Sequence, residues 1–343
     1  MNSPLSSLGV ELPVLAAPMA GGGSTPALVT AAARAGSLGF LAAGYKTAGQ
    51  LAEQIAAVRA AGGTFGVNVF VPNPVPVDRR AFARYAAALQ AEADGYDLRL
   101  TGQEPVEDDD AWRDKLDLLL AEPVPVAGFT FGLPEPSVFR AFKQAGTLTV
   151  QTVTSPAEAR AAAEAGADLL AVQGLAAGGH SGTWTPERIP DPVALPDLVR
   201  AVRAATGLPI IAAGGLSTPG EVAQAVQAGA VAVLAGTALL RSDESGASAV
   251  HQAALAAPDR GDPVLTRAFT GRPARGLPNT FIEKYGPIAP SGYPALHHLT
   301  SPLRKAAAAA GHPELVHLWA GTGYRNTRPG PAADILTALA SGS

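Results

Sequence analysis

The chain has 343 residues, 47% of them hydrophobic, and a formal net charge of -4, with 25 basic residues that form no dense cluster. This charge balance argues against nucleic acid or an anionic membrane surface as a partner, and the lack of cysteine excludes disulfides, thiolate nucleophiles, thiolate zinc sites and cysteine-ligated iron–sulfur clusters. There is no signal-like N-terminal segment and no apolar span long enough for a membrane helix, so we expect a cytoplasmic protein.

Short apolar runs alternate with alanine-rich helical stretches along the first two thirds of the chain. The predicted strands cover residues 14–19, 38–43, 65–71, 126–131, 147–153, 168–173, 209–213 and 231–235. Helical patterns between them include residues 25–35, 47–61, 156–165, 196–205 and 218–228, several of which begin after Ser or Thr before Pro and end in Ala-Gly.

Strands that are apolar throughout and alternate with helices predict a parallel sheet covered on both faces. Eight such units favour a (β/α)8 TIM-type barrel. The alternative, an open doubly wound sheet, calls for G-x-G-x-x-G after the first strand, whereas the chain has Met19-Ala20-Gly21-Gly22-Gly23-Ser24 there. We therefore predict the α/β barrel.

An insertion at residues 72–125 separates the third and fourth strands. It contains helical stretches at 79–92 and 111–121 and an acidic run at 107–110. The acidic run is expected to be a solvated loop, because it has no spaced ligand pattern that would indicate a metal site.

Beyond residue 240 the alternation of strands and helices is lost. We predict a smaller, mainly helical cap subdomain at residues 241–324 that covers the mouth of the barrel. The barrel itself would comprise residues 1–240 and 325–343, with a last helix at 332–340 that returns to it.

Glycine pairs end the seventh and eighth predicted strands. Gly214-Gly215 and Gly236-Thr237 would offer backbone N–H groups, and Thr237 a hydroxyl, where barrels of this kind bind phosphate. The simpler interpretation is that both pairs only make tight turns. Two pairs on adjacent strands favour phosphate binding.

Two amides, Asn68 and Gln173, lie at the ends of otherwise apolar strands. Buried amides need hydrogen-bond partners. A heterocycle with alternating donors and acceptors, such as the pyrimidine ring of a flavin, would satisfy them, and so would neighbouring backbone.

One imidazole follows the sixth strand in a glycine-rich loop, Gly178-Gly179-His180-Ser181-Gly182. A histidine is often structural, but the flanking glycines leave little to bury this one, and it follows a barrel strand, so a role in the site is favoured. Ser181 is equally well explained as a cap or turn residue. His297, in the cap, could face the mouth of the barrel, and the remaining histidines show no metal-ligand spacing.

Taken in order, these motifs resemble the nitronate monooxygenases, formerly called 2-nitropropane dioxygenases, which are FMN-dependent barrel enzymes. The resemblance covers nearly the whole chain. It rests on the segments at residues 17–22, 65–70, 131–134, 173–182, 212–215, 236–237 and 269–276.

The resemblance implies FMN as the cofactor, no metal, and His180 as the catalytic base or the group that orients the substrate. It implies that FMN is held by Pro18, Met19, Ala20, Asn68, Gln173, Gly178, Gly179, Gly214, Gly215, Gly236 and Thr237. Substrate contacts would come from Thr130, where many members have histidine, and from Ser181, Tyr293 and His297.

The activity implied is the oxidation of alkyl nitronates, or of nitroalkanes, with O2 to a carbonyl compound and nitrite. The nitronate would give one electron to the flavin, and the anionic semiquinone would react with O2. A monomer or a homodimer is expected.

Three alternatives remain open from the sequence. The first is an FMN-dependent NAD(P)H reductase, like the flavin-type enoyl-acyl-carrier-protein reductases or a quinone reductase, although residues 173–177 lack the glutamate of the reductases' similar loop. The second is a barrel that binds a phosphorylated ligand without redox chemistry. The third keeps the barrel but gives His180 no function.

Overall fold

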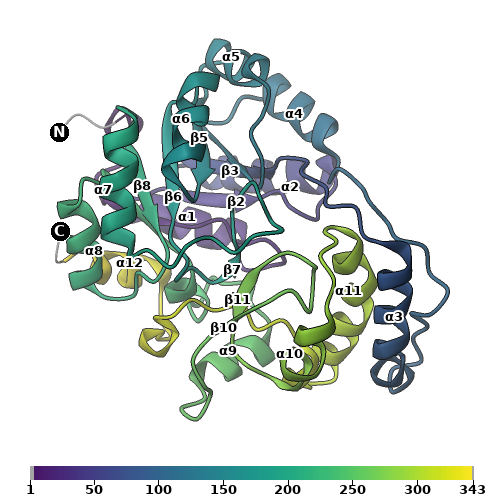
Figure 1. Cartoon of the computed structure of the whole chain (residues 1–343). Coiled ribbons are helices and arrows are strands. Elements are labelled where there is room, and N and C mark those ends of the chain that lie inside the picture. Colours follow the sequence, from purple (N-terminus) through teal and green to yellow (C-terminus); the bar gives the residue numbers. More distant parts are fainter. Residues whose placement is uncertain (1–3, 342–343) are drawn as a thin grey trace.

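A closed barrel of eight parallel strands with helices around it forms the larger part of the molecule in the computed structural model, which describes residues 4–341 (Figure 1). The strand order is β1-β2-β3-β4-β5-β6-β8-β9, and β9 pairs with β1 to close the barrel. These strands are β1 (Val14–Ala16), β2 (Gly39–Ala42), β3 (Phe65–Phe70), β4 (Val126–Thr130), β5 (Leu148–Val153), β6 (Leu169–Gln173), β8 (Ile210–Ala213) and β9 (Ala232–Ala235). Each lies within a predicted run, so the TIM-type barrel is confirmed.

The helices that cover the barrel begin at the caps that the sequence predicts. The side chains of Thr25, Ser155 and Thr218 each accept a hydrogen bond from a backbone N–H in the first turn, and proline follows each of them. The barrel helices are α1 (Pro26–Arg34), α2 (Ala48–Ala61), α4 (Trp112–Ala121), α5 (Pro136–Gln144), α6 (Pro156–Ala165), α7 (Leu195–Ala205), α8 (Pro219–Gln227) and α12 (Ala332–Ala340).

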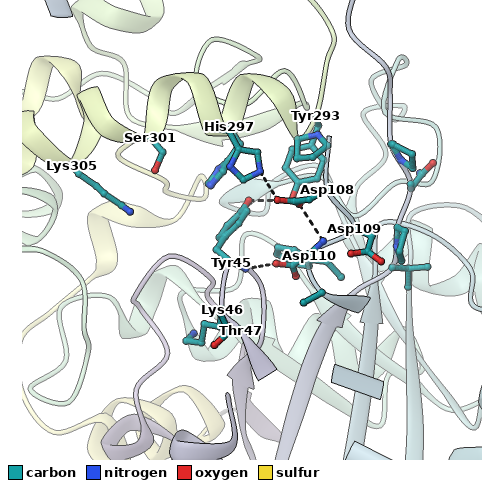
Figure 2. A pocket seen from close by; sticks show the side chains of 18 residues that line it. Tyr45, Lys46, Thr47, Asp108, Asp109, Asp110, Tyr293, His297, Ser301 and Lys305 are labelled. Atoms are coloured by element: carbon teal, nitrogen blue, oxygen red, sulfur yellow. Dashed lines mark hydrogen bonds and ion pairs between the residues drawn. The ribbon is translucent and has the colours of Figure 1, made fainter. Parts of the chain in front are cut away.

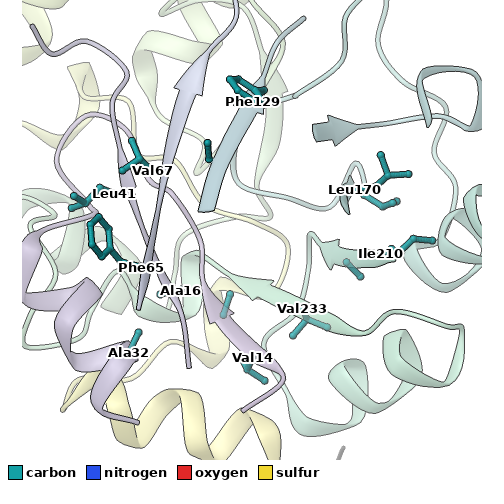
Figure 3. Close-up of a cluster of buried hydrophobic side chains, with 14 of the residues drawn as sticks. Val14, Ala16, Ala32, Leu41, Phe65, Val67, Phe129, Leu170, Ile210 and Val233 are labelled. Carbon is teal, nitrogen blue, oxygen red and sulfur yellow. The ribbon is translucent and has the colours of Figure 1, made fainter. Parts of the chain in front are cut away.

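Side chains alternate along each barrel strand between two cores. One set, which includes Val67, Leu170 and Val233, packs outward against the helices (Figure 3). The other set, which includes Leu15, Phe40 and Ile211, fills the barrel interior. Because both faces of the sheet are buried in this way, the strands show the continuous apolar runs that identified them.

The cap and the insertion share one core. Helix α3 (Arg79–Asp94) of the insertion packs beside α11 (Ala295–Ala309), in a cluster that also contains residues of α10 (Thr280–Tyr285) (Figure 1). Tyr85 of α3 donates a 2.6 Å hydrogen bond to the carbonyl of Ala268. The insertion therefore extends the cap as well as joining two barrel strands. The cap also contains α9 (Ala249–Ala256) and the short 3-10 helices η3 (Gly286–Ile288) and η4 (Pro313–Leu315), while η1 (Ser6–Leu8), η2 (Thr237–Leu239) and η5 (Tyr324–Asn326) lie elsewhere.

A small antiparallel sheet that the sequence did not predict joins the barrel to the cap. It consists of β7 (Gly179–His180), β11 (Ala274–Gly276) and β10 (Val264–Thr266), in the order β10-β11-β7. The loop expected after the sixth strand is thus a short strand held by the cap. Among residues 4–341, no helix is long and apolar enough to span a membrane.

Candidate active site

Polar side chains form a layer inside the barrel at the carboxyl ends of the strands. Thr130 Oγ1 donates to Asn68 Oδ1 and lies 3.0 Å from the hydroxyl of Thr152. Asn68 is buried, and its only side-chain hydrogen bond within the described residues is made by Oδ1, so Nδ2 donates to none of them. This donor is therefore available to a ligand above the layer.

Gln173 belongs to the same layer but contacts only backbone. Its Nε2 donates to the carbonyl of His180 at 3.2 Å, and its Oε1 accepts from the N–H of Gly182 at 2.7 Å. Of the two kinds of partner that the sequence left open, the structure shows the neighbouring backbone, and a contact of Gln173 with a cofactor stays a prediction. Its visible function is to hold the His180 loop.

His180 lies on β7 among aromatic rings. Its Nε2 is 2.9 Å from the hydroxyl of Thr270, and no partner is found for Nδ1 among residues 4–341. The rings of Phe131, Tyr293 and Trp319 lie 5.8, 5.9 and 5.5 Å from the imidazole. The ring is therefore fixed on one side and surrounded by apolar surface, with Nδ1 left to meet a ligand.

A buried arginine clamps the segment that follows His180. Arg272 is fully buried, and its Nε and Nη2 donate to the carbonyls of Ser181 and Thr183. Its guanidinium carbon lies 3.9 Å from the centre of the Phe131 ring. Nη1 is buried and has no hydrogen-bond partner among the described residues. The guanidinium thus shapes the loop and retains one donor for a further group.

A second buried arginine, Arg304, lies on α11. Its side chain donates to Thr300 Oγ1 and to the carbonyl of His297, and contacts the Nδ1 atoms of His297 and His317 at 3.3 and 3.2 Å. Burial lowers the pKa of His297 well below its ordinary value, and the Arg304 charge lowers it further. His297 is therefore neutral beside this cation.

Neither buried arginine forms an ion pair with a carboxylate in the part of the chain that the structure describes. Burial, then the charges of Arg272 and Arg304, lower the pKa of His180 to about 3. The pKa values of both arginines fall only to about 10, so both stay protonated at neutral pH. The site therefore combines a neutral imidazole with two buried positive charges that no carboxylate contacts directly.

The glycine loops after β8 and β9 present backbone donors at the same end of the barrel. Gly214 and Gly215 have φ values of 112° and 74°, which favour glycine. The N–H groups of Gly215, Gly236 and Thr237 donate no hydrogen bond within residues 4–341, although all three residues are partly buried. Unpaired N–H groups grouped in this way fit an anionic oxygen ligand such as the phosphate of FMN.

Thr237 also connects these loops to a later segment. Its Oγ1 accepts a 2.9 Å hydrogen bond from the N–H of Gly321. A Cβ at Gly178 would lie 2.5 Å from the Gly321 nitrogen, so only glycine permits this approach. The loop after β6 and the segment around Gly321 are therefore closely packed beside the glycine pairs.

The other predicted cofactor and substrate residues lie at the same rim. Pro18, Met19 and Ala20 follow β1 and are partly buried, and the N–H of Met19 donates to Ser24 Oγ at 2.8 Å. Ser181 is buried, and its N–H donates to the carbonyl of Pro273 at 2.8 Å. The backbone of Ser181 thus serves the loop, and its role toward a substrate stays a prediction, as do the other assignments of site residues.

A cavity of about 350 Å³ adjoins this rim (Figure 2). Tyr45, Tyr293 and His297 form its inner end, and the Tyr45 and His297 rings stack in parallel with centroids 3.9 Å apart. Tyr293 faces both the cavity and His180. The cavity therefore begins one aromatic ring away from the imidazole.

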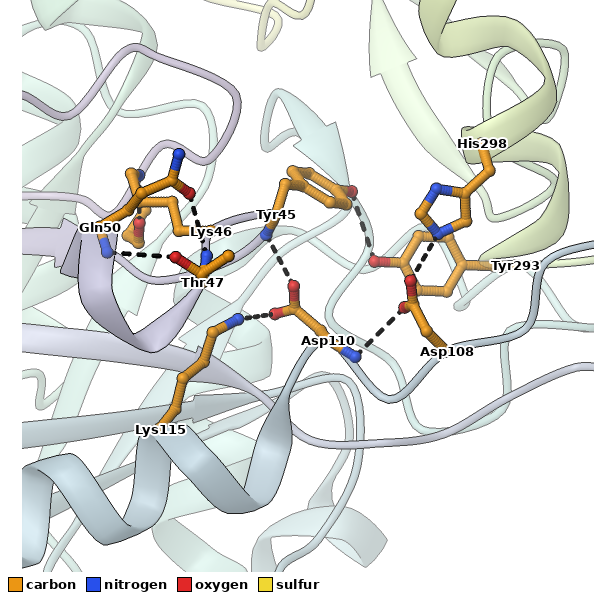
Figure 4. A network of polar contacts seen from close by, with 10 residues as sticks. Tyr45, Lys46, Thr47, Gln50, Asp108, Asp110, Lys115, Tyr293 and His298 are labelled. Carbon is orange, nitrogen blue, oxygen red and sulfur yellow. Dashed lines mark hydrogen bonds and ion pairs between the residues drawn. The ribbon is translucent and has the colours of Figure 1, made fainter.

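The acidic run at 107–110 is a loop, but it forms one wall of this cavity and is held by specific contacts (Figure 4). Asp110 Oδ2 lies 2.7 Å from Nζ of the fully buried Lys115, and Oδ1 accepts from the N–H of Tyr45 at 2.8 Å. Asp108 is 3.0 Å from Nε2 of His298. The expectation of a solvated loop was therefore wrong for Asp110, because the buried ammonium of Lys115 draws its carboxylate inward.

Several residues that shape the site were missed by sequence reasoning. They are Tyr45, Asp110, Lys115, Thr270, Arg272, Arg304 and Trp319. The segment at 269–276 gave a signal through the family resemblance, but nothing in it marked Arg272 as buried. Within residues 4–341, no group of His, Asp or Glu is arranged to hold a metal ion.

Comparison with known proteins gives a consistent result. The family model described as nitronate monooxygenase matches residues 2–342. A probable nitronate monooxygenase of Staphylococcus aureus (strain MRSA252) is 36% identical over 338 residues, which cover 96% of this chain and 94% of that protein.

Two solved structures resemble this chain over nearly its whole length. A nitroalkane oxidase from Streptomyces ansochromogenes superposes with a TM-score of 0.92 at 45% identity and covers 99% of this chain and 97% of its own. FabK from Thermotoga maritima superposes with a TM-score of 0.76 at 26% identity, with coverage of 99% and 95%.

Proposed function

The chain belongs to the nitronate monooxygenase family, and we propose that it oxidises alkyl nitronates with O2, using bound FMN, to a carbonyl compound and nitrite. It is a flavin oxidoreductase that acts on nitro compounds. The proposal concerns the form of the substrate, the products and the identity of the flavin.

The observation that carries the proposal is the neutral His180 beside two buried cations. An imidazole whose pKa is about 3 has little driving force to remove the C–H proton of a neutral nitroalkane. The charges of Arg272 and Arg304 favour an anion at the same place. A nitronate is already deprotonated and negatively charged, so it suits this site better than its conjugate acid.

FMN, when bound, would supply the acceptor for the electrons of the substrate. The unpaired N–H groups of Gly215, Gly236 and Thr237 would hold its phosphate. Asn68 Nδ2, which donates to no described residue, would donate to the heterocycle from within the barrel. These donors support a flavin mononucleotide at the mouth of the barrel.

The protein's own part is to bind, orient and exclude water. His180 Nδ1 would hydrogen-bond a nitronate oxygen while Thr270 fixes the other ring nitrogen. Phe131, Tyr293 and Trp319 would exclude water around it. Arg272 would keep the segment after His180 in place.

Anaerobic mixing tests the reaction class. Purified protein should contain flavin that elutes as FMN, and propyl-1-nitronate alone should change its oxidised absorbance bands within the turnover time. Nitrite and propanal should then form on admission of O2. Absence of any spectral change with the nitronate would contradict the proposal.

A reductase remains the second candidate, because the glycine-rich loop that carries His180 is similar to the loop of the flavin-type enoyl-acyl-carrier-protein reductases. The same anaerobic experiment with NADH and NADPH separates the two. Rapid bleaching of the flavin by either nucleotide, with none by the nitronate, would establish the reductase.

A further inference from the structure

We propose that Thr130 is a positioning residue, whose hydroxyl fixes the side-chain amide of Asn68 so that Nδ2, and not Oδ1, faces the bound ligand. The inference rests on the proposed function, because the ligand it concerns is the flavin. It gives Thr130 a role toward the cofactor in place of the substrate contact that the family resemblance implies.

A chain of hydrogen bonds crosses three neighbouring strands of the barrel. Asn68 lies on β3, Thr130 ends β4 and Thr152 lies on β5. Thr130 Oγ1 is 3.0 Å from Asn68 Oδ1 and 3.0 Å from the hydroxyl of Thr152. Asn68 and Thr152 are buried and Thr130 is partly buried, so each of these polar atoms depends on its protein partner.

Counting the hydroxyl hydrogens shows which way the amide faces. With Oδ1 toward Thr130, Thr130 donates to Asn68 and Thr152 donates to Thr130, so both hydrogens are used. With the amide turned over, Nδ2 would donate to Thr130 and Thr130 to Thr152. The Thr152 hydrogen would then have no acceptor, because this hydroxyl contacts no other side chain or carbonyl among residues 4–341. A buried donor without a partner costs free energy, so the first arrangement is favoured.

Two glycines fix the three side chains in place. Gly128 is the β4 partner of Asn68, and a Cβ there would lie 2.8 Å from Asn68 Oδ1. A Cβ at Gly182 would lie 2.7 Å from Cγ2 of Thr152 and 3.6 Å from Cγ2 of Thr130. The segment after β7 therefore packs on the methyl groups of both threonines, and this packing keeps their hydroxyls turned toward each other and toward the amide.

The fixed amide offers a bound flavin a donor. Oδ1 is already occupied, so Asn68 would meet an acceptor of the heterocycle through Nδ2. Acceptor atoms of a flavin carry more negative charge after reduction, and a donor beside them therefore favours the reduced form. The single hydrogen of Thr130 is used by Asn68, so it is not available to a substrate oxygen.

Release of FMN from the holoprotein on dilution, followed by flavin fluorescence, tests the position of the amide. Thr130→Val keeps the shape of the side chain, removes the hydroxyl and should raise the Kd of FMN about three- to tenfold, as expected for one hydrogen bond. The reduction potential of the bound flavin should become more negative. Thr130→Ser should restore both values, and Thr130→Ala is a second variant should Thr130→Val fold poorly.

Thr149→Val is the matched control. Thr149 is a buried threonine on the same strand as Thr152, and its hydroxyl donates to Asp168 at 2.8 Å. This variant loses a buried hydroxyl without touching Asn68, so the Kd of FMN should stay at the wild-type value. Equal Kd values for the wild type and Thr130→Val would overturn the proposal.

A double-mutant cycle shows whether Thr130 acts through Asn68. In an Asn68→Ala background, Thr130→Val should produce little further change in the Kd of FMN, because there is no amide left to position. Effects of the two substitutions that multiply would overturn the proposal. A higher KM for propyl-1-nitronate in Thr130→Val, with unchanged release of FMN, would also overturn it and give Thr130 the substrate contact.

The outcome is separable from that of the proposed function. A protein that binds FMN, shows the coupling between Thr130 and Asn68 and leaves nitronates unoxidised would overturn the proposed function and support the positioning role. Oxidation of nitronates by a protein in which Thr130→Val changes neither the Kd of FMN nor the reduction potential would do the reverse.

Discussion

At the scale of single residues, the buried guanidinium groups of Arg272 and Arg304 determine the electrostatic character of the site. Burying a cation without a carboxylate is costly unless hydrogen bonds or a bound anion compensate for lost hydration. Arg272 and Arg304 are partly compensated by carbonyl groups, and Arg272 retains an unpaired Nη1. The remaining positive charge adds to the effect of burial in lowering the pKa of His180, and it favours an anionic substrate.

Replacing the imidazole tests its contact with the substrate. His180→Asn should lower kcat/KM for propyl-1-nitronate by about 100-fold, because general acid–base and orienting groups contribute on that order. The exposed His312, which contacts Tyr96, provides the matched control, and His312→Asn should retain wild-type kinetics. Oxygen consumption measures both. A His180→Asn rate within twofold of wild type would leave His180 without a function.

Removing the charge of Arg272 should change the pH dependence. In the folded protein His180 stays neutral down to a pKa of about 3, and Arg272 contributes to this low value. In Arg272→Met the pKa should rise, so loss of kcat/KM on acidification should begin at higher pH. Arg272→Lys keeps the charge but cannot donate to the carbonyls of Ser181 and Thr183 together. It should therefore lower kcat/KM at neutral pH, while the pH at which kcat/KM falls on acidification should change less than in Arg272→Met. If kcat/KM of both variants fell at the same pH on acidification, the proposed effect of the Arg272 charge on His180 would be contradicted.

The location of Asn68 and His180 at the mouth of the barrel could be predicted, because one ends an apolar barrel strand and the other lies in the glycine-rich segment that follows such a strand. Their chemical roles stay predictions. The role of Arg272 could not be predicted. An arginine between glycine and proline gives no sign that it will be buried, since its partners are carbonyls of residues 181 and 183, about ninety positions earlier.

At the level of elements, the site depends on close contact between the β6–β7 loop and the segment around Gly321. Gly178 permits that contact, because any Cβ there would meet backbone at 2.5 Å. The same contact orients Thr237, whose hydroxyl accepts from Gly321. The loop and the glycine pairs after β8 and β9 are therefore coupled.

Gly178→Ala should separate these elements. We expect a loss of stability of roughly 1–3 kcal/mol from overpacking and a lower FMN content after purification. Gly220→Ala is the control, because a Cβ at this position in α8 meets no atom within 4 Å. Thermal denaturation and the ratio of flavin to protein absorbance measure the two effects. Full flavin content in Gly178→Ala would show that the contact does not serve the cofactor.

The barrel strands and helices could be predicted, because the apolar pattern that identifies each of them lies within its own residues. The sheet of β7, β10 and β11 could not, because its strands have only two or three residues and β7 pairs with β11 across a long sequence separation. Such short strands carry no periodic pattern. Tertiary contacts with the cap, such as the Arg272 clamp, define them instead.

For the molecule as a whole, four partly buried histidines link stability to pH. Burial lowers the pKa of His180 to about 3 and of His251 to about 4, and those of His297 and His317 lie well below the ordinary value. Below about pH 6.5 these four histidines bind protons in the unfolded chain but stay neutral in the folded protein. The free energy of unfolding should therefore decrease as the pH falls from about 6.5 toward 4.

Denaturant titrations between pH 8 and pH 5 test this. Each such histidine can contribute up to about 1.4 kcal/mol per pH unit below the unfolded value. His251→Gln removes one of these groups, so the slope of the free energy of unfolding against pH should decrease by the contribution of one proton. A midpoint that stays constant from pH 8 to pH 5 would contradict the predicted linkage.

Helix α12 leaves the ribosome only after the whole cap has been made. It covers β1 and packs against α1 and α8, all of which are synthesised long before it. At ordinary elongation rates, residues 241–331 take on the order of 5–20 s to make. During that time the barrel is incomplete at its first strand, with apolar surface exposed to chaperones, while the cap can already form its own core. The order of synthesis therefore favours a cap that folds before the barrel beneath it is complete.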